Sequence, residues 1–314
     1  MNENRLPIHF APLQGYTDAA YRRAHARIFG GVDTYYSPFV RVEHGEIRRK
    51  DMREISPEQN TGFDLIPQLI APQPDKLEQI MDLFVANGYR EVDINLGCPF
   101  PMLAKRHNGA GMLPYPEEVK ALLTAAIGKY PEVRFSVKLR LGWENPEECL
   151  ALLPLFNELP LSHVILHPRL GKQQYKGEVD PEGFEAFYDG CNKPLFYNGD
   201  LRTTEDIQRI TERFPKLTGT VIGRGLLANP ALALEYQQGQ PLSPDEMMKR
   251  VKQLHTEVYA GYQEQLQGGD LQLLTKMKYF WEYLLPEGDR KARKAIHKAT
   301  KLSNYEVAVG NLLK

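Results

Sequence analysis

Short apolar segments rich in β-branched and aromatic residues alternate, up to about residue 230, with longer segments in which apolar residues recur every three or four positions. The short segments have the length and composition of buried parallel strands, and the longer ones are typical of amphipathic helices that cover them. Residues 75–88, for example, place their apolar side chains on one helical face and end at Gly88. Eight strands are predicted, at residues 8–13, 34–40, 64–70, 91–97, 135–141, 163–169, 194–200 and 219–225.

Eight strand–helix units in about 225 residues predict an α/β fold, a closed (β/α)8 TIM barrel. A doubly wound open sheet is the alternative, but the number of units fits a barrel of ordinary size. After Pro230 the pattern becomes helical throughout, with helices predicted at 241–265, 271–285 and 289–303. The chain therefore divides into a predicted barrel catalytic domain, 1–240, and an all-helical C-terminal domain, 241–314.

Composition argues against membrane, collagen-like, disordered and disulfide-stabilised proteins. Of 314 residues, 42% are hydrophobic and 25% charged, and no apolar run approaches the ~20 residues of a membrane span. The first residues, MNENRLPIHF, lack the apolar stretch of a secretory signal. The three cysteines are scattered and odd in number, which argues against a disulfide framework or a cysteine-based zinc site. We expect a cytoplasmic protein with no membrane segment and no metal.

The formal net charge of −1 conceals a local excess of positive charge. Residues 276–301 hold eight lysines and arginines and three acidic residues. A basic patch of this kind is sufficient for binding nucleic acid, even in a protein that is neutral as a whole.

Glycines follow the last two predicted strands, where barrels commonly bind phosphate groups. Gly199, Gly223 and Gly225 allow backbone N–H groups to approach phosphate oxygens, and Arg224 adds positive charge. Glycines after strands are often plain turns, but their joint position favours a ligand that carries phosphate.

Four other residues near strand ends each have two interpretations. Lys138 either points into the barrel toward an anionic ligand or lies outside between helices. His167 and Gln68 either contact a ligand or satisfy their hydrogen bonds within the core. Cys98, between a glycine and a proline, begins a loop rich in proline and glycine, where a thiol can act as acid, nucleophile or redox group.

Six segments form a recognisable series of motifs: APLQGYTD (11–18), PQLIA (67–71), DINLGCPFPMLAKRHNGAGMLPYPE (93–117), VKLRLGW (137–143), YNGDL (197–201) and IGRGLLANP (222–230). In these motifs and their order, the sequence resembles the tRNA-dihydrouridine synthase family over about residues 8–230. The segments SPFVRV (37–42) and KMKYFWEYL (276–284) further resemble the C-type branch, which modifies uridine 16 of the D-loop.

The resemblance implies an FMN-dependent oxidoreductase that reduces the C5–C6 bond of a D-loop uridine in tRNA to 5,6-dihydrouridine, with NADPH or NADH as reductant. It also implies that Cys98 is the acid that protonates C5, that Asn95 is the substrate-side asparagine, and that Lys138 stabilises negative charge on the reduced flavin.

The same resemblance assigns binding residues. Residues implied to hold FMN are Pro12, Leu13, Gln14, Gln68, Lys138, His167, Asn198, Gly199, Asp200, Gly223 and Arg224. Residues implied to contact the D-arm of tRNA are Arg41, Asn95, Lys105, Tyr175, Lys276, Lys278 and Tyr283, with Asn108 beside Lys105 in the loop behind Cys98.

Two other functions remain as alternatives. A flavin barrel acting on a free pyrimidine has no use for a basic helical segment. A non-catalytic tRNA-binding protein has no need of both Cys98 and Lys138. No protein partner is inferred.

Overall fold

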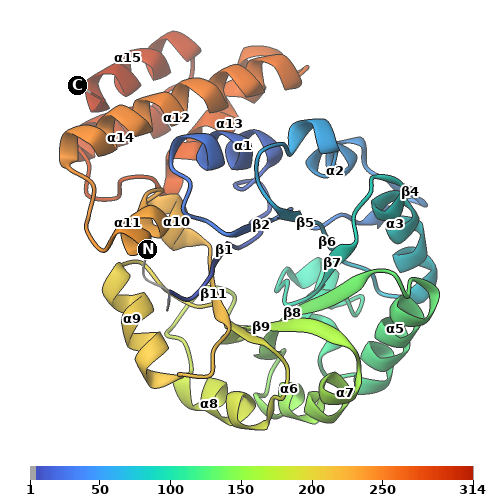
Figure 1. Cartoon of the computed structure of the whole chain (residues 1–314). Helices are drawn as coiled ribbons and strands as arrows, with labels where there is room; N and C mark the ends of the chain where they lie inside the picture. The colour runs from blue at the N-terminus through green and yellow to red at the C-terminus, as the bar shows by residue number, and fades with distance from the viewer. Residues whose placement is uncertain (1–4, 314) are drawn as a thin grey trace.

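The computed structural model describes residues 5–313. Parallel strands form a nearly closed ring surrounded by helices (Figure 1), in the order β5-β2-β1-β11-β10-β9-β8-β7-β6. The predicted (β/α)8 barrel is therefore confirmed. The strands are β1 (Ile8–Phe10), β2 (Thr34–Tyr36), β5 (Leu65–Ile66), β6 (Gln68–Leu69), β7 (Glu91–Leu96), β8 (Arg134–Gly142), β9 (Leu161–Leu170), β10 (Leu195–Tyr197) and β11 (Gly219–Ile222).

The third predicted strand, 64–70, is divided at Pro67. Its first half, β5, pairs with β2, and its second half, β6, pairs with β7. Proline has no N–H to donate to a neighbouring strand, so the ladder is interrupted there. The Pro67 carbonyl still accepts from the Asp93 N–H at 3.0 Å. The barrel closes through this divided strand.

Four other strands end at least three residues earlier than predicted. β1, β2, β10 and β11 stop at Phe10, Tyr36, Tyr197 and Ile222, where the chain leaves the sheet at the mouth of the barrel. Pro12 and Pro38 lie just beyond the first two ends and cannot donate ladder hydrogen bonds. A short hairpin of β3 (Val42–Glu43) and β4 (Glu46–Ile47) was not predicted.

Helices follow the strands around the outside of the ring. No helix within residues 5–313 combines the length and the apolar character needed to cross a membrane. The helices of the barrel region are α1 (Ala19–Ile28), α2 (Arg49–Glu54), α3 (Pro74–Ala86), α4 (Pro101–Ala104), α5 (Pro116–Lys129), α6 (Glu147–Ala151), α7 (Leu153–Glu158), α8 (Pro181–Gly190), α9 (Thr204–Arg213), α10 (Arg224–Ala228) and α11 (Leu232–Gln238), with single 3-10 turns at Pro57–Gln59 and Gly109–Met112.

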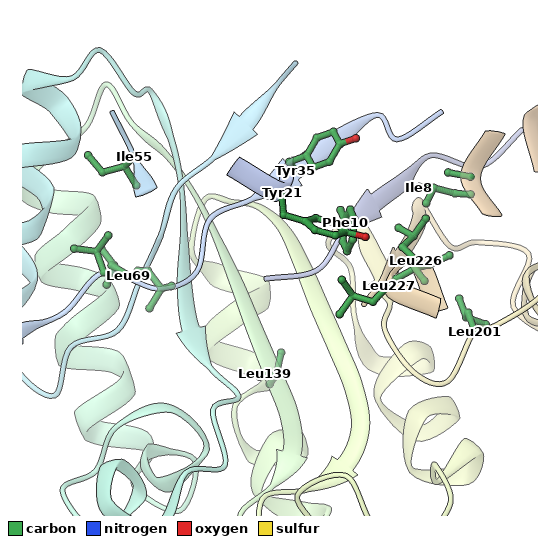
Figure 2. Close-up of a cluster of buried hydrophobic side chains, with 14 of the residues drawn as sticks. Ile8, Phe10, Tyr21, Tyr35, Ile55, Leu69, Leu139, Leu201, Leu226 and Leu227 are labelled. Carbon is green, nitrogen blue, oxygen red and sulfur yellow. The ribbon is translucent and has the colours of Figure 1, made fainter. Parts of the chain in front are cut away.

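Alternation along the strands separates the outer core from the barrel interior. On β8, Val137 and Leu139 are fully buried within the apolar core of the protein, whereas Lys138 lines a cavity at the mouth of the barrel. Figure 2 shows part of this core, in which the ring of Phe10 lies beside that of Tyr21, with a centroid separation of 6.1 Å. Of the two orientations open to Lys138, the structure therefore has the inward one.

Four helices make up the C-terminal region: α12 (Pro244–Gln265), α13 (Gly269–Tyr283), α14 (Arg290–Lys298) and α15 (Leu302–Leu312). The first two confirm the predictions within a few residues. The predicted helix 289–303 is wrong at its C-terminal end, because Ala299 adopts an extended conformation and ends α14. The next helix, α15, buries Tyr305, whose hydroxyl accepts from the Trp281 indole N–H at 2.9 Å.

Of these helices, α12 packs against α1 of the barrel and α13 against α10, and Figure 1 shows α12 and α13 beside α1. Asp18, the N-cap of α1, accepts from the Tyr262 hydroxyl of α12 at 2.8 Å and from the Lys276 ammonium of α13 at 2.9 Å. Lys276, predicted to contact tRNA, is thus held in an ion pair within the protein.

Two buried histidines face each other across a tyrosine inside the barrel. The Tyr36 hydroxyl lies 3.2 Å from His9 Nδ1 and 2.8 Å from His163 Nε2. Burial lowers the pKa of His9 to about 3 and that of His163 to about 4. The same cause lowers two further histidine pKa values to about 4, those of His25 and His255.

We expect the free energy of unfolding to fall as the pH drops below about 6.5. There the unfolded chain binds protons on these histidines while the folded chain does not, so each contributes a loss of about 1.4 kcal/mol per pH unit. Asp93 and Glu54 act in the opposite sense, because burial raises their pKa values to about 6 and about 7 and protonation stabilises the fold. The four histidines outnumber these two carboxylates, so the net effect of acid is a loss of stability.

Urea unfolding at pH 7.5 and at pH 5 measures the difference in the free energy of unfolding. The variant His163→Gln keeps a polar partner for Tyr36 and is expected to lose less stability between the two pH values. Equal stability at both pH values would contradict this prediction.

Candidate functional site

A cavity of about 940 Å³, including its open mouth, lies at the carboxyl ends of the strands. This is the end of a barrel where active sites form, and the volume suits a small-molecule cofactor. The structure brings together here most of the residues singled out in the sequence. Those that line the cavity are Pro12, Leu13, Gln14, Asn95, Cys98, Lys138, His167, Tyr175, Asn198, Gly199, Asp200, Gly223 and Arg224.

Other predicted residues lie outside the cavity lining. Gln68 is completely buried and binds Asn95 rather than the cavity. Arg41 donates to Glu43 at 3.0 Å, and Tyr283 packs on Tyr16 with ring centroids 5.2 Å apart. The predicted tRNA contacts Lys105, Lys276 and Lys278 and the loop residue Asn108 are also outside the lining of the cavity.

Lys138 is a half-buried cation with no ion-pair partner among residues 5–313. Burial and the charge of Arg140 lower the pKa of its ammonium to about 8, while the charge of Asp93 acts in the opposite sense. No carboxylate among residues 5–313 lies within ion-pair distance of the Lys138 Nζ. The charge of Asp93 therefore acts on this ammonium only from a longer distance. An ammonium of this kind is stabilised by negative charge on a ligand in the cavity.

The side chain of His167 lines the cavity as a neutral imidazole. Burial, together with the charges of Arg140, Lys138 and Arg169, holds its pKa well below the usual value. Its Nε2 lies 3.1 Å from Arg169 Nη1 and accepts a hydrogen bond there, because a guanidinium can only donate. The imidazole proton is therefore on Nδ1, and His167 is not a proton source near neutral pH.

The end of the cavity near β10 and β11 has a net positive charge. Asp200 accepts from Arg169 and also from Arg224 at 2.6 Å. Burial alone would raise the pKa of Asp200, but the hydrogen bonds and charges of these arginines hold it below its usual value. Two guanidinium groups thus share one carboxylate beside Gly199 and Gly223, which suits a phosphate group.

Cys98 is held by a tight turn at the end of β7. Its N–H donates to Asn95 Oδ1 at 2.8 Å, and its carbonyl accepts from the Ala110 N–H at 3.1 Å. Gly109 has a φ of +58°, and a Cβ there would lie 2.8 Å from the Cys98 Cβ, so the loop can pass behind Cys98 only with glycine at this position.

The thiol of Cys98 is a neutral group near pH 7. Burial raises its pKa above the usual value, although the Phe100 N–H and the charges of Arg140 and Arg41 act against this. A thiol that keeps its proton can serve as a general acid, in contrast to the thiolate required of a nucleophile.

Two arginines that sequence reasoning missed organise the loops around the cavity. Arg140 donates to the carbonyls of Gly97 at 3.0 Å and Gln174 at 2.6 Å, which ties the loop of Cys98 to the loop after β9. Arg169 binds His167 and Asp200, as described above. Their positions in the KLR and HPR segments, two residues after Lys138 and His167, place them on the same inward face, and this alternation was the available signal.

Tyr175 lies at the mouth of the cavity and is 48% exposed. The guanidinium carbons of Arg140 and Arg224 lie 5.3 Å and 4.9 Å from the centre of its ring. An exposed aromatic ring beside two cations is a suitable surface for stacking and for phosphate contacts at the rim of the cavity.

Comparison with known proteins identifies the family. The profile of the family described as Dihydrouridine synthase (Dus) matches residues 9–309. The chain is 25% identical over 268 residues to tRNA-dihydrouridine(16) synthase of Pseudomonas putida, covering 81% of this chain and 82% of that protein. It is 28% identical over 250 residues to the protein of the same name from Neisseria meningitidis, with 76% and 74% covered. It is also 26% identical over 228 residues to tRNA-dihydrouridine synthase B of Pasteurella multocida, with 72% and 67% covered.

Solved structures share the fold at low sequence identity. The old yellow enzyme from Trypanosoma cruzi superimposes with a TM-score of 0.52 at 13% identity, over 83% of this chain and 95% of that one. A variant of NCR from Zymomonas mobilis gives a TM-score of 0.54 at 14% identity, over 76% and 88%. Because the family profile spans nearly the whole chain, the protein belongs to the dihydrouridine synthase family.

Proposed function

We propose that this protein is a flavin-dependent tRNA-dihydrouridine synthase that reduces the C5–C6 bond of a D-loop uridine, with NADPH or NADH as reductant. The observation that carries the proposal is that Lys138 and Cys98 line the same cavity. Lys138 is a cation with no ion-pair partner in the described part of the chain, and Cys98 is a neutral thiol. The names of the Pseudomonas putida and Neisseria meningitidis relatives support uridine 16 as the position modified.

The residues of the cavity fit FMN. The positive end beside Gly199, Gly223 and Arg224 suits its single phosphate. Lys138 faces the cavity from β8, where its ammonium can offset negative charge on the isoalloxazine ring. Pro12, Leu13 and Gln14 line the cavity from the chain that follows β1.

Reduction of uracil adds two electrons and two hydrogens across C5–C6. When bound, the flavin supplies the hydride equivalent that reaches C6. Cys98 gives its thiol proton to C5, and solvent restores that proton afterwards. Asn95 keeps one amide hydrogen for the substrate, because its Nδ2 carries two and donates only one, to Gln68 at 2.8 Å.

The target uridine must leave its place in folded RNA to reach Cys98. We propose that the rim residues Tyr175 and Arg41 and the helical region 241–314 bind the surrounding tRNA. The exposed basic side chains of the helical region lie mainly on and beside α14: Arg290, Lys291, Lys294, Lys298 and Lys301.

The direct test offers two substrates to the enzyme under anaerobic conditions with its flavin reduced in advance. Unmodified tRNA is expected to oxidise the flavin rapidly, and uridine monophosphate at the same concentration is expected to leave it reduced. Transfer RNA that already carries dihydrouridine is the matched control. Equal oxidation by the free nucleotide would favour the enzyme of free pyrimidines, and a protein that binds tRNA without holding flavin would favour the non-catalytic alternative.

The basic helical region gives a separate prediction about tRNA affinity. Replacing both Lys294 and Lys298 by glutamine is expected to weaken binding and to lower the slope of log affinity against log salt by about 0.7–0.9 for each phosphate that these lysines neutralise. Flavin content is expected to stay the same, because neither side chain lines the cavity. Lys216→Gln, which removes an exposed lysine just before β11, is the matched control. An unchanged salt slope would mean that this surface does not bind tRNA.

Lys276 and Lys278 are expected to behave differently from each other. Lys276→Ala removes the ion pair with Asp18 and should lower the thermal stability of the protein, with weaker tRNA binding as a secondary effect. Lys278→Ala should weaken tRNA binding without loss of stability. Thermal melts and tRNA titrations of the two variants distinguish these outcomes, and a destabilised Lys278→Ala protein would contradict the assignment.

A further inference from the structure

A buried carboxylate lies one layer below the cavity. Asp93 on β7 is aligned with Gln68 on β6 and with Ser136 on β8, and all three are completely buried. Asp93 accepts from Gln68 Nε2 at 2.6 Å and from Ser136 Oγ at 2.7 Å. Neither the catalytic chemistry nor the binding of flavin described above uses this carboxylate.

The hydrogen bonds continue from Asp93 to the turn that holds Cys98. Gln68 donates to Asp93 through Nε2, so its Oε1 points the other way and accepts from Asn95 Nδ2 at 2.8 Å. The Asn95 amide is thereby oriented with Oδ1 toward the turn, where it accepts from the Gly97 N–H at 3.0 Å and the Cys98 N–H at 2.8 Å.

An ionised carboxylate fixes the direction of this whole chain of hydrogen bonds, because it can only accept. If the side-chain amide of Gln68 rotated by 180°, exchanging its oxygen and nitrogen, the amide of Asn95 would have to rotate as well. The Asn95 N–H groups would then face the N–H groups of Gly97 and Cys98. Buried donors that face each other leave both groups unsatisfied, which is costly.

We infer that Asp93 is a positioning residue that acts through Gln68 and Asn95 to hold Cys98 where it can protonate the substrate. The inference rests on the proposed function, in which Cys98 is the acid. Burial raises the pKa of Asp93 to about 6, and of the charged groups that face it Glu91 raises the pKa further while Lys138 lowers it. The carboxylate is therefore mainly ionised at pH 7.5, where the test is made.

The test compares three variants by the anaerobic oxidation of pre-reduced flavin at increasing tRNA concentrations. Asp93→Leu removes the acceptor and is expected to lower the limiting rate by about 10², the usual effect of misplacing a reacting group by about 1 Å. The tRNA concentration at half-maximal rate should change much less, since only the Asn95 amide among the proposed tRNA contacts depends on Asp93. Asp93→Asn should recover most of the rate, because its oxygen can still accept from Gln68 while its amide donates to the Ser136 hydroxyl.

Ser136→Ala is the matched control. It removes the other partner of the same buried carboxylate but leaves the hydrogen bonds from Asp93 to Cys98 in place, so a rate close to that of the wild type is expected. A loss in Ser136→Ala as large as in Asp93→Leu would mean that any disturbance of the barrel interior has this effect, and it would overturn the inference. If Asp93→Leu does not fold, Asp93→Ala replaces it, because the smaller side chain likewise removes the acceptor of the Gln68 Nε2 hydrogen bond.

A second readout does not depend on tRNA or on flavin chemistry. Iodoacetamide alkylation of Cys98, followed by peptide mass mapping, is expected to be at least several-fold faster in Asp93→Leu, because the turn that partly covers the half-buried thiol is loosened. Cys191, which is half-buried elsewhere in the protein, is the internal reference. Wild-type alkylation and a wild-type limiting rate in Asp93→Leu would overturn the inference. If the wild-type enzyme itself is not oxidised by tRNA, the proposed function fails, and the alkylation result still decides whether Asp93 holds Cys98.

Discussion

Replacement of Cys98 by alanine is expected to slow the oxidation of reduced flavin by tRNA by about 10²–10⁴, the usual contribution of a positioned general acid. Flavin binding and reduction by NADPH should be unchanged, because the turn around Cys98 is held by backbone groups that alanine retains. Rapid mixing of the pre-reduced variant with unmodified tRNA measures this step directly.

Two further cysteine variants complete that experiment. Cys98→Ser should restore little of the rate, since a hydroxyl has a far higher pKa than a thiol. Cys191→Ala is the matched control and should behave as the wild type. Rapid flavin oxidation in Cys98→Ala would remove Cys98 from the mechanism, whereas a loss of flavin in that variant would assign it a structural role.

Replacement of Lys138 by methionine is expected to slow flavin reduction by about 10²–10³, the effect of removing one group that stabilises developing negative charge. Methionine fills a similar space but removes the ammonium that we propose offsets negative charge on the reduced ring. Stopped-flow reduction by NADPH and the flavin content of the purified protein measure the two consequences. Lys129→Met, which removes a lysine on the outer helix α5, is the control.

The pKa of Lys138 predicts that affinity for reduced flavin depends on pH. Burial and the charge of Arg140 lower the pKa of Lys138 to about 8 in the flavin-free protein, while Asp93 and Cys98 act in the opposite sense. Affinity for reduced flavin should therefore fall as the pH rises above about 8, because the ammonium loses its proton there. Lys138→Met should lack this dependence. A wild-type protein whose affinity is constant across that range would show that Lys138 does not hold the charge of the reduced ring.

Hydrophobic patterning was sufficient to predict the barrel and the positions of its strands. It could not predict the break at Pro67, because apolar residues lie on both sides of the proline and a strand there can pair with either neighbour. It also missed α15, since the basic pattern of 289–303 does not reveal that the chain turns at Ala299 to bury Tyr305.

Spacing alone left the orientation of Lys138 open, and the register of β8 against β7 and β9 resolves it. The motif around Cys98 predicted which residues gather at the cavity but not how they are held. The hydrogen bonds from Asp93 through Gln68 to Asn95 join neighbouring strands, and the role of Arg140 depends on carbonyls from two distant loops. Interactions of this kind follow from the closed barrel and not from any local sequence pattern.

The most direct test of the central claim is to examine the RNA itself after a single turnover. Unmodified tRNA is mixed with enzyme whose flavin has been reduced, digested to nucleosides and fragments, and analysed by mass spectrometry. We expect one D-loop uridine, at position 16, to become heavier by two hydrogens in step with flavin oxidation, and no such product with Cys98→Ala on the same timescale. Flavin oxidation by tRNA that leaves every uridine unchanged in mass would contradict the proposed function.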